Sequence, residues 1–334
     1  MNRICGFLAA ALFLAPAALA GPSGYHLART VPLPGDEGWD ALATDQATHR
    51  LFVTHGTHVV AVDLADFSVA GDIPNTPRTH GAAFAPGGLG FISDGGDDTV
   101  TVFDAKTLTV SKRIAVGKGP DAIVYDPATK KVLTFNGGSK DATVIDVASL
   151  TVDGTIPLGG KPEFAAADGK GKVFANIEDT SEIVVIDPRT MTVLKRWPLA
   201  PCEEPSGIAI DTAHHRLFSG CHNKMMSVSD ARTGKVVATP PTGQGVDGAD
   251  YDPATHLAFS PNGGDGTLTV IREVAPSKFE VIDTVQTQKG ARTMVLDPRT
   301  HNVYLVTADF GPPIPPATRP SILPGTVRLL VYEK

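Results

Sequence analysis

The sequence predicts an all-β protein, a seven-bladed β-propeller of four-stranded blades in which an N-terminal strand closes the last blade. Three observations predict this fold class: a unit of four short strands that recurs along the chain, a spacing of about 42 residues between equivalent positions, and a seventh unit that lacks its fourth strand. A repeat of this length, built from strands and turns, is typical of propeller blades.

The repeating unit is clearest in residues 121–162. Its first strand is apolar and ends at Asp126, and the following Pro127-Ala128-Thr129 completes a turn sequence. The second strand ends at Asn136-Gly137-Gly138, and the fourth alternates apolar and polar residues as a half-exposed outer strand does. The four expected strands span residues 122–125, 131–135, 143–146 and 152–158.

The residue that ends the first strand, Asp126, has a counterpart in every unit. These counterparts are Asp45, Ala85, Asp168, Asp211, Asp252 and Asp297. Seven aligned positions predict seven blades. The seventh unit has only three strands before the chain ends, whereas segment 25–33 has an outer-strand pattern and belongs to no other unit. We therefore expect segment 25–33 to pair with segment 326–332, which closes the ring and covers both strand edges.

The repeats run through the chain without a linker, so residues 21–334 are expected to form a single domain. Residues 1–20 are expected to be a cleaved signal peptide, because Arg3 precedes an apolar run and Ala18-Leu19-Ala20 provides a small-residue cleavage site. The apolar run is too short to span a membrane comfortably. We therefore expect a periplasmic or secreted monomer with no membrane span after cleavage.

The charge balance disfavours a polyanionic partner. The chain has 29 Lys and Arg against 36 Asp and Glu, a formal net charge of −7. Proteins that bind nucleic acid normally present a basic face, because they neutralise phosphates with Lys and Arg. Nucleic acid is therefore not expected as a partner.

The strand sequences carry a family resemblance. The second-strand endings LFVTHG, LTFNGG, VFANIED and LAFSPNGG and the third strands TVTVFD and IVVID resemble the YncE-like family, also called the YVTN-repeat propellers. The resemblance covers nearly the whole mature chain and implies a propeller fold and export. It implies little about activity, because such propellers include binding modules and enzymes. In place of the family's Asn, this chain has His55, Asp94 and Cys221, where a specific function is expected.

Polar residues are expected to form two rings at the top mouth of the central channel. The first ring, five residues before each aligned position, comprises Asp40, His80, Asp121, Glu163, Ser206, Asp247 and Arg292. The second ring, at the ends of the second strands, comprises His55, Asp94, Asn136, Asn176, Cys221 with His222, Asn262 and Asp309. Such crowding can bind a ligand or shift pKa values, and the alternative is a solvated mouth with ordinary turn capping. The expected ligand-binding residues are Asp40, His80, Asp121, Glu163, Asp247, Arg292 and His222.

Two more specific hypotheses concern the same mouth. The first is a divalent cation held by Asp121, Asn136, Glu163 and Asn176, a composition similar to the metal site of gluconolactonase-like propellers, which usually have six blades. Such a cation would polarise a lactone or ester carbonyl, with His80 or His55 as general base. The second is an anion clamp formed by Arg292, for which a structural ion pair with Asp247 and Asp40 is the alternative.

The two cysteines of the mature chain are expected to lie close together. Cys202 precedes the fifth unit, and Cys221 ends the second strand of that unit. In an oxidising compartment a disulfide is expected. A soft-metal site formed with His222 is the alternative.

A proline-rich segment, residues 311–324, interrupts the seventh unit and is expected to be a lid, a docking arm or a solvated insertion. The sequence thus favours an exported binding or scaffold protein that holds a small ligand, a metal or a partner protein at the mouth. The alternative is a metal-assisted hydrolase of the lactonase or esterase type, or a lyase, acting at the same mouth.

Overall fold

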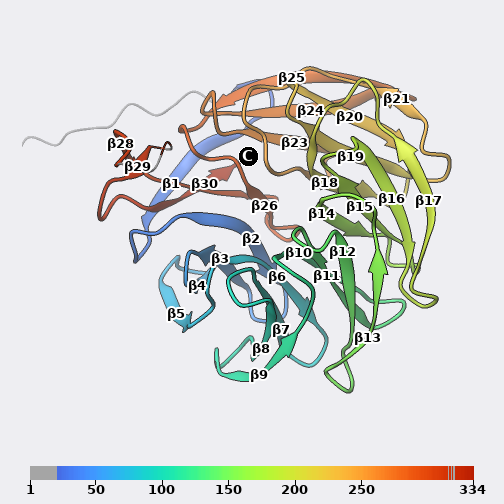
Figure 1. Ribbon diagram of the computed structural model, residues 1–334. Coiled ribbons are helices and arrows are strands. Elements are labelled where there is room, and N and C mark those ends of the chain that lie inside the picture. Colours follow the sequence, from blue (N-terminus) through green and yellow to red (C-terminus); the bar gives the residue numbers. More distant parts are fainter. Residues whose placement is uncertain (1–20, 315, 317, 319) are drawn as a thin grey trace, which may run out of the picture.

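The structure, a computed structural model, describes residues 21–334 except 315, 317 and 319, so the expected signal peptide lies outside the described residues. These residues form seven four-stranded antiparallel sheets and one two-stranded hairpin, and they contain no helix. Consequently, no helix in this part of the chain is long and apolar enough to cross a membrane. The sheets stand around a common centre like the blades of a propeller, which confirms the predicted fold class (Figure 1).

Each of the first four blades uses four consecutive strands. Blade 1 comprises β2 (Trp39–Asp45), β3 (Arg50–His55), β4 (His58–Asp63) and β5 (Val69–Pro74). Blade 2 comprises β6 (Thr79–Ala85), β7 (Leu89–Asp94), β8 (Thr99–Asp104) and β9 (Val110–Ala115). Blade 3 comprises β10 (Pro120–Asp126), β11 (Lys131–Asn136), β12 (Asp141–Asp146) and β13 (Thr151–Pro157). Blade 4 comprises β14 (Pro162–Ala167), β15 (Val173–Ile177), β16 (Glu182–Asp187) and β17 (Thr192–Pro198).

Blades 5 and 6 follow the same plan, whereas blade 7 takes its outermost strand from the N-terminal end of the described chain. Blade 5 comprises β18 (Pro205–Asp211), β19 (Arg216–Cys221), β20 (Met225–Asp230) and β21 (Val236–Ala238). Blade 6 comprises β22 (Asp250–Asp252), β23 (Leu257–Asn262), β24 (Thr267–Ala275) and β25 (Lys278–Gln286). Blade 7 comprises β26 (Met294–Leu296), β27 (Val303–Thr307), β30 (Arg328–Glu333) and β1 (His26–Pro32). The hairpin of β28 (Phe310–Gly311) and β29 (Ser321–Ile322) begins directly before the proline-rich segment and ends inside it.

The closure of the ring is as predicted. β1 is the outermost strand of blade 7 and pairs antiparallel with β30, from His26 opposite Glu333 to Pro32 opposite Arg328. In Figure 1 the blue β1 runs beside the red β30, so the two ends of the described chain share one sheet. The first and last strands thereby cover each other's hydrogen-bonding edges.

In every blade except blade 2, which has Ala85, an aspartate begins the turn after the first strand. Asp126 accepts hydrogen bonds from the Thr129 backbone N (3.1 Å) and the Thr129 hydroxyl (2.6 Å), and Lys130 then adopts a left-handed φ of 57°. Asp45 makes equivalent bonds to Thr48. Because the carboxylate satisfies turn donors, this turn chemistry recurs at the blade period and fixes the length of each unit.

The hydrophobic core lies between neighbouring blades. Between blades 3 and 4, for example, Leu133 and Val144 pack with Val173 and Val184, and all four side chains are fully buried. Each such side chain contributes roughly 1.5–3 kcal/mol by burial. First strands of adjacent blades contact one another around the ring, so they form its innermost layer. The packed blades therefore provide a rigid frame for the residues at the mouth.

Candidate functional site

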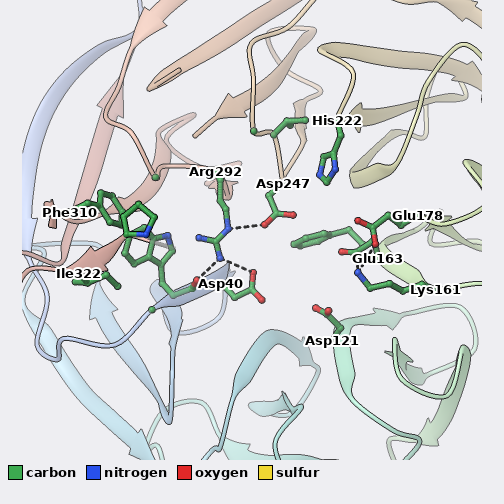
Figure 2. A pocket seen from close by; sticks show the side chains of 17 residues that line it. Asp40, Asp121, Lys161, Glu163, Glu178, His222, Asp247, Arg292, Phe310 and Ile322 are labelled. Atoms are coloured by element: carbon green, nitrogen blue, oxygen red, sulfur yellow. Dashed lines mark hydrogen bonds and ion pairs between the residues drawn. The ribbon is translucent and has the colours of Figure 1, made fainter. Parts of the chain in front are cut away.

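A cavity of about 650 Å³ opens at the mouth of the central channel. Polar side chains from the starts of several first strands and from the segments that precede these strands line it, as Figure 2 shows. Phe310, together with Pro320 and Ile322 of the proline-rich segment, forms part of the wall. The first predicted ring is therefore brought together at one concave surface. Its members at the cavity wall are Asp40, Asp121, Glu163, Asp247 and Arg292.

A repeated β-bulge places the ring residues at the mouth. In five blades the pairing between first and second strand shifts register directly around the ring position, as between Trp39 and Leu42 or between Pro120 and Ile123. A bulge leaves one residue outside the regular ladder and redirects its side chain. Asp40 and Asp121 occupy such positions, and both side chains line the cavity.

Asp40, His80 and Asp121 form one connected group. His80 Nδ1 donates a hydrogen bond to Asp40 Oδ2 (2.6 Å) and lies 3.7 Å from Asp121 Oδ1. Burial opposes protonation of His80, but the Asp40 hydrogen bond and the Asp121 charge outweigh it, so the pKa of His80 is raised. Burial raises the pKa of Asp121 to about 6, against the opposing charge of His80. Ligand atoms of these three residues lie within 4.8 Å of one another, so the group can hold a cation.

Arg292 joins this group to the other side of the ring. Its Nε donates to Asp247 Oδ2 (2.9 Å), its Nη2 lies 3.7 Å from Asp40 Oδ1, and Nη2 also donates to the Trp39 carbonyl (2.8 Å). Ser206 Oγ donates to Asp247 Oδ1 (2.7 Å). The guanidinium therefore pairs with two acidic side chains and with a backbone carbonyl. This arrangement corresponds to the structural ion pair that is the alternative to an anion clamp.

Glu163 belongs to a separate cluster on the opposite wall. Lys161 Nζ lies 2.6 Å from Glu163 Oε1 and 2.5 Å from Glu178 Oε2. Burial and the Asp121 charge raise the pKa of Glu163, and the Lys161 ammonium acts against that shift. Lys161 and Glu178 were not among the predicted ring positions. Their positions in the sequence could have identified them, because Lys161 directly precedes the first strand of blade 4 and Glu178 directly follows its second strand.

The ionisable side chains of the cavity are predominantly acidic. Its wall includes the carboxylates of Asp40, Asp121, Glu163, Glu178 and Asp247, and the cations Lys161 and Arg292. The uncharged wall is aromatic and aliphatic. Trp39 and Phe310 lie with ring centroids 6.3 Å apart, and the Arg292 guanidinium lies 5.9 Å from the Trp39 ring centroid. The cavity thus combines an acidic side with an aromatic side.

The expected four-residue metal set is not assembled at this cavity, because Asn136 and Asn176 do not line it. Asn136 Nδ2 donates to Asp141 Oδ1 (2.6 Å) and Thr143 Oγ1 (2.9 Å) within its own blade. Asn176 Nδ2 donates to the Ser206 carbonyl (2.9 Å) of the next blade. Both amides are fully buried, so they support the blades rather than the mouth.

The two expected general bases differ in their placement. His80 lies beside Asp40 and Asp121, behind the cavity wall. His55 does not line the cavity; it is fully buried at the end of β3 and stacked on His58, with ring centroids 4.8 Å apart. Burial lowers the pKa of His55, and the neighbouring His58 acts in the same direction.

The predicted disulfide is present between Cys202 and Cys221, whose Cα atoms are 5.5 Å apart. It ties the loop before β18 to the end of β19. His222 follows directly, lines the cavity, and has its Nδ1 3.2 Å from Glu204 Oε2. The disulfide therefore fixes the segment that carries His222 at the mouth.

The comparisons with known proteins agree on the fold. No family model matches the sequence, and no curated protein sequence matches it either. A chain of Kuenenia stuttgartiensis hydrazine synthase is 16% identical, with a TM-score of 0.69 over 81% of this chain and 93% of that chain. A chain of the mitotic checkpoint complex is 14% identical, with a TM-score of 0.75 over 98% and 99%. The Pan2 WD40 domain of Neurospora crassa is 13% identical, with a TM-score of 0.70 over 92% and 94%. At these identities the similarity shows the β-propeller fold alone.

Proposed function

We propose that the protein is an exported binding protein whose mouth cavity holds a small ligand with a positively charged group. The observation that carries this proposal is the composition of the cavity wall, where five carboxylates face two cations beside an aromatic wall. A cationic group gains from the carboxylates and from the faces of aromatic rings. The cavity volume of about 650 Å³ lies within the range of small-molecule sites.

Export is supported by two independent features. The first 20 residues have the composition of a signal peptide, and a disulfide joins Cys202 to Cys221. The acidic cavity and the net charge of −7 also disfavour a nucleic acid as the ligand. A partner protein at the same face is a further possibility, since Ile314 and Leu323 of the proline-rich segment are exposed apolar side chains.

Calorimetric titration of the mature protein with small amines, quaternary ammonium compounds and matched carboxylates tests the proposal. We expect saturable binding of the amines and the quaternary ammonium compounds, and no saturable binding of the carboxylates. Asp247→Asn and Asp121→Asn should each weaken binding by about tenfold, because each removes a carboxylate from the wall. Glu280→Gln, an exposed change on the outer strand β25, is the matched control and should bind as the unaltered protein does. Preferential binding of the carboxylates would contradict the proposal.

The second candidate is a metal-assisted hydrolase or lyase at the same mouth. It is favoured by the Asp40–His80–Asp121 group, in which a histidine is oriented by one carboxylate and flanked by another. Of the expected metal ligands, Asp121 and Glu163 line the cavity. Assays of lactone and ester hydrolysis, with chelator-treated protein and with added divalent cations, distinguish this candidate. Cation-dependent turnover that is lost in a folded His80→Gln variant would support it, and the absence of turnover would favour simple binding.

A further inference from the structure

The hairpin of β3 and β4 carries two histidines, one on each side of its turn. Both lie close to the carboxylate of Glu37. His55 ends β3, His58 begins β4, and the two are directly paired across the hairpin with nearly parallel rings. Glu37, from the β1–β2 connection, places its Oε2 3.9 Å from His58 Nδ1. One ligand atom from each of the three residues lies within 4.8 Å of the other two. None of these residues lines the mouth cavity.

His55 is the observation that points to a ligand. Its side chain is fully buried, yet neither ring nitrogen has a hydrogen-bond partner among the described residues. A buried polar group without a partner is unfavourable, because it has lost its hydrogen bonds to water without gaining others. The His58 ring and the Glu37 carboxylate each place a ligand atom within 4.8 Å of one of the His55 nitrogens, and both are metal-ligand types.

Hydrogen bonds hold Glu37 in place, and a second carboxylate lies near His58. The Glu37 carboxylate accepts hydrogen bonds from the Thr57 backbone N (2.6 Å) and from the Thr57 hydroxyl (3.0 Å), so the hairpin turn positions it. On its other side, His58 Nε2 lies 3.9 Å from Asp72 Oδ1 on β5. A carboxylate behind a histidine orients the ring and raises its basicity in many metal sites.

The β1–β2 connection closes over the two imidazoles at Gly35. A Cβ at this position would lie 3.1 Å from His58 Cε1 and 3.3 Å from His55 Cε1, and the residue has a φ of +94°. Glycine therefore allows the backbone to approach both rings, and the same connection brings Glu37 to them two residues later.

We propose that Glu37, His55 and His58 form a binding site for a divalent transition metal ion of the zinc class, with Asp72 orienting His58. Two imidazoles and one carboxylate suit Zn²⁺ and its neighbours in the series, whereas Ca²⁺ and Mg²⁺ prefer oxygen ligands alone. Ligands at about 2.0–2.2 Å from one zinc ion lie a few ångströms apart, which is close to the present separation of Glu37 and His58. Three protein ligands leave a coordination position for solvent.

Titration of chelator-treated mature protein with Zn²⁺ and with Co²⁺ tests this proposal. We expect one Zn²⁺ per chain by calorimetry and a visible Co²⁺ absorption band that Zn²⁺ displaces. Glu37→Gln, an exposed change that leaves the core intact, and His58→Gln should each weaken binding by at least about tenfold. Asp72→Asn should weaken it by about tenfold, as changes behind a ligand typically do. His256→Gln, a change of an exposed histidine in the turn before β23, is the matched control and should bind as before.

Three results would overturn the proposal. The first is the absence of saturable binding to the folded protein. The second is unchanged affinity in both Glu37→Gln and His58→Gln, with circular dichroism confirming that the variants are folded. The third is binding that is lost in Asp121→Asn and retained in Glu37→Gln, which would locate the ion at the mouth instead.

Discussion

Asp94 is predicted to make the stability of the protein fall as the pH rises. Asp94 is the last residue of β7, and its side chain is fully buried. Its Oδ2 accepts hydrogen bonds from Thr101 Oγ1 (2.5 Å) and Thr99 Oγ1 (3.3 Å). Burial raises the pKa of Asp94 from 3.8 to about 7, although Thr101 and Arg113 oppose the shift. Blades 3 and 6 have Asn136 and Asn262 at this position, and their amides donate to the equivalent threonines.

The magnitude follows from linkage between protonation and folding. Between pH 4 and pH 7 the folded protein holds a proton on Asp94 that the unfolded chain has lost, so the free energy of unfolding falls by about 1.4 kcal/mol per pH unit. Above pH 7 both states are ionised and the decrease stops. The pKa values of 3.8 and about 7 correspond to a total of about 4 kcal/mol. Asp94→Asn removes this ionisation and retains a hydrogen bond to Thr101.

Urea unfolding of the unaltered protein and of Asp94→Asn at pH 5, 6, 7 and 8 measures the effect. We expect the variant to be more stable at every pH, with an advantage that grows by about 3 kcal/mol between pH 5 and pH 8. Asn262→Asp is the reciprocal variant, because it places a carboxylate at a matched buried position beside two threonine hydroxyls. It should lose stability as the pH rises. Stability curves of unaltered protein and Asp94→Asn that stay parallel from pH 5 to pH 8 would refute this reasoning.

Three further predictions concern the mouth and the frame. Affinity for a cationic ligand should fall by about tenfold from pH 7.5 to pH 5, because Asp121 takes up a proton near pH 6. Calorimetry of Asp121→Asn should show an affinity that depends less on pH. Replacing Cys202 and Cys221 with Ser should lower the free energy of unfolding by about 3 kcal/mol, as measured in urea, because the disulfide closes a loop of separation 19. Removing residues 21–34 should lower the melting temperature sharply in calorimetry, because β30 loses its partner β1, and unchanged melting would contradict the role of this strand.

The fold could be predicted from the sequence because its turn chemistry is local. An Asp at the end of the first strand, which in Asp126 accepts hydrogen bonds from the backbone two and three residues onward, marks every blade except blade 2, where Ala85 takes its place. The closure of blade 7 was also predictable, because a unit without a fourth strand requires one and segment 25–33 was unassigned. The disulfide followed from the same alignment, which placed Cys202 and Cys221 at one end of blade 5.

The second ring could not be placed from the sequence. The second strands lie within the blades and are buried along almost their whole length, so residues such as Asn136, Asn176 and His55 point into the packing between strands and blades. The first ring was identified by counting residues, but the reason for its position was not visible. It depends on a bulge between first and second strands, and strand periodicity carries no signal for an extra residue.

The bulge also explains why the first ring is chemically diverse. A residue outside the ladder contributes little to strand pairing, so its identity can change without disturbing the packed blade on either side. The neighbouring positions cannot change so freely, and they remain small or apolar, as Ala122 and Ile123 do after Asp121. The same irregularity recurs in five blades, and in three of them the ring side chain (Asp40, Asp121 or Glu163) lines the cavity while the frame stays constant. Differences in ligand among propellers with this frame are accordingly expected at these positions, and in this chain they are predominantly acidic.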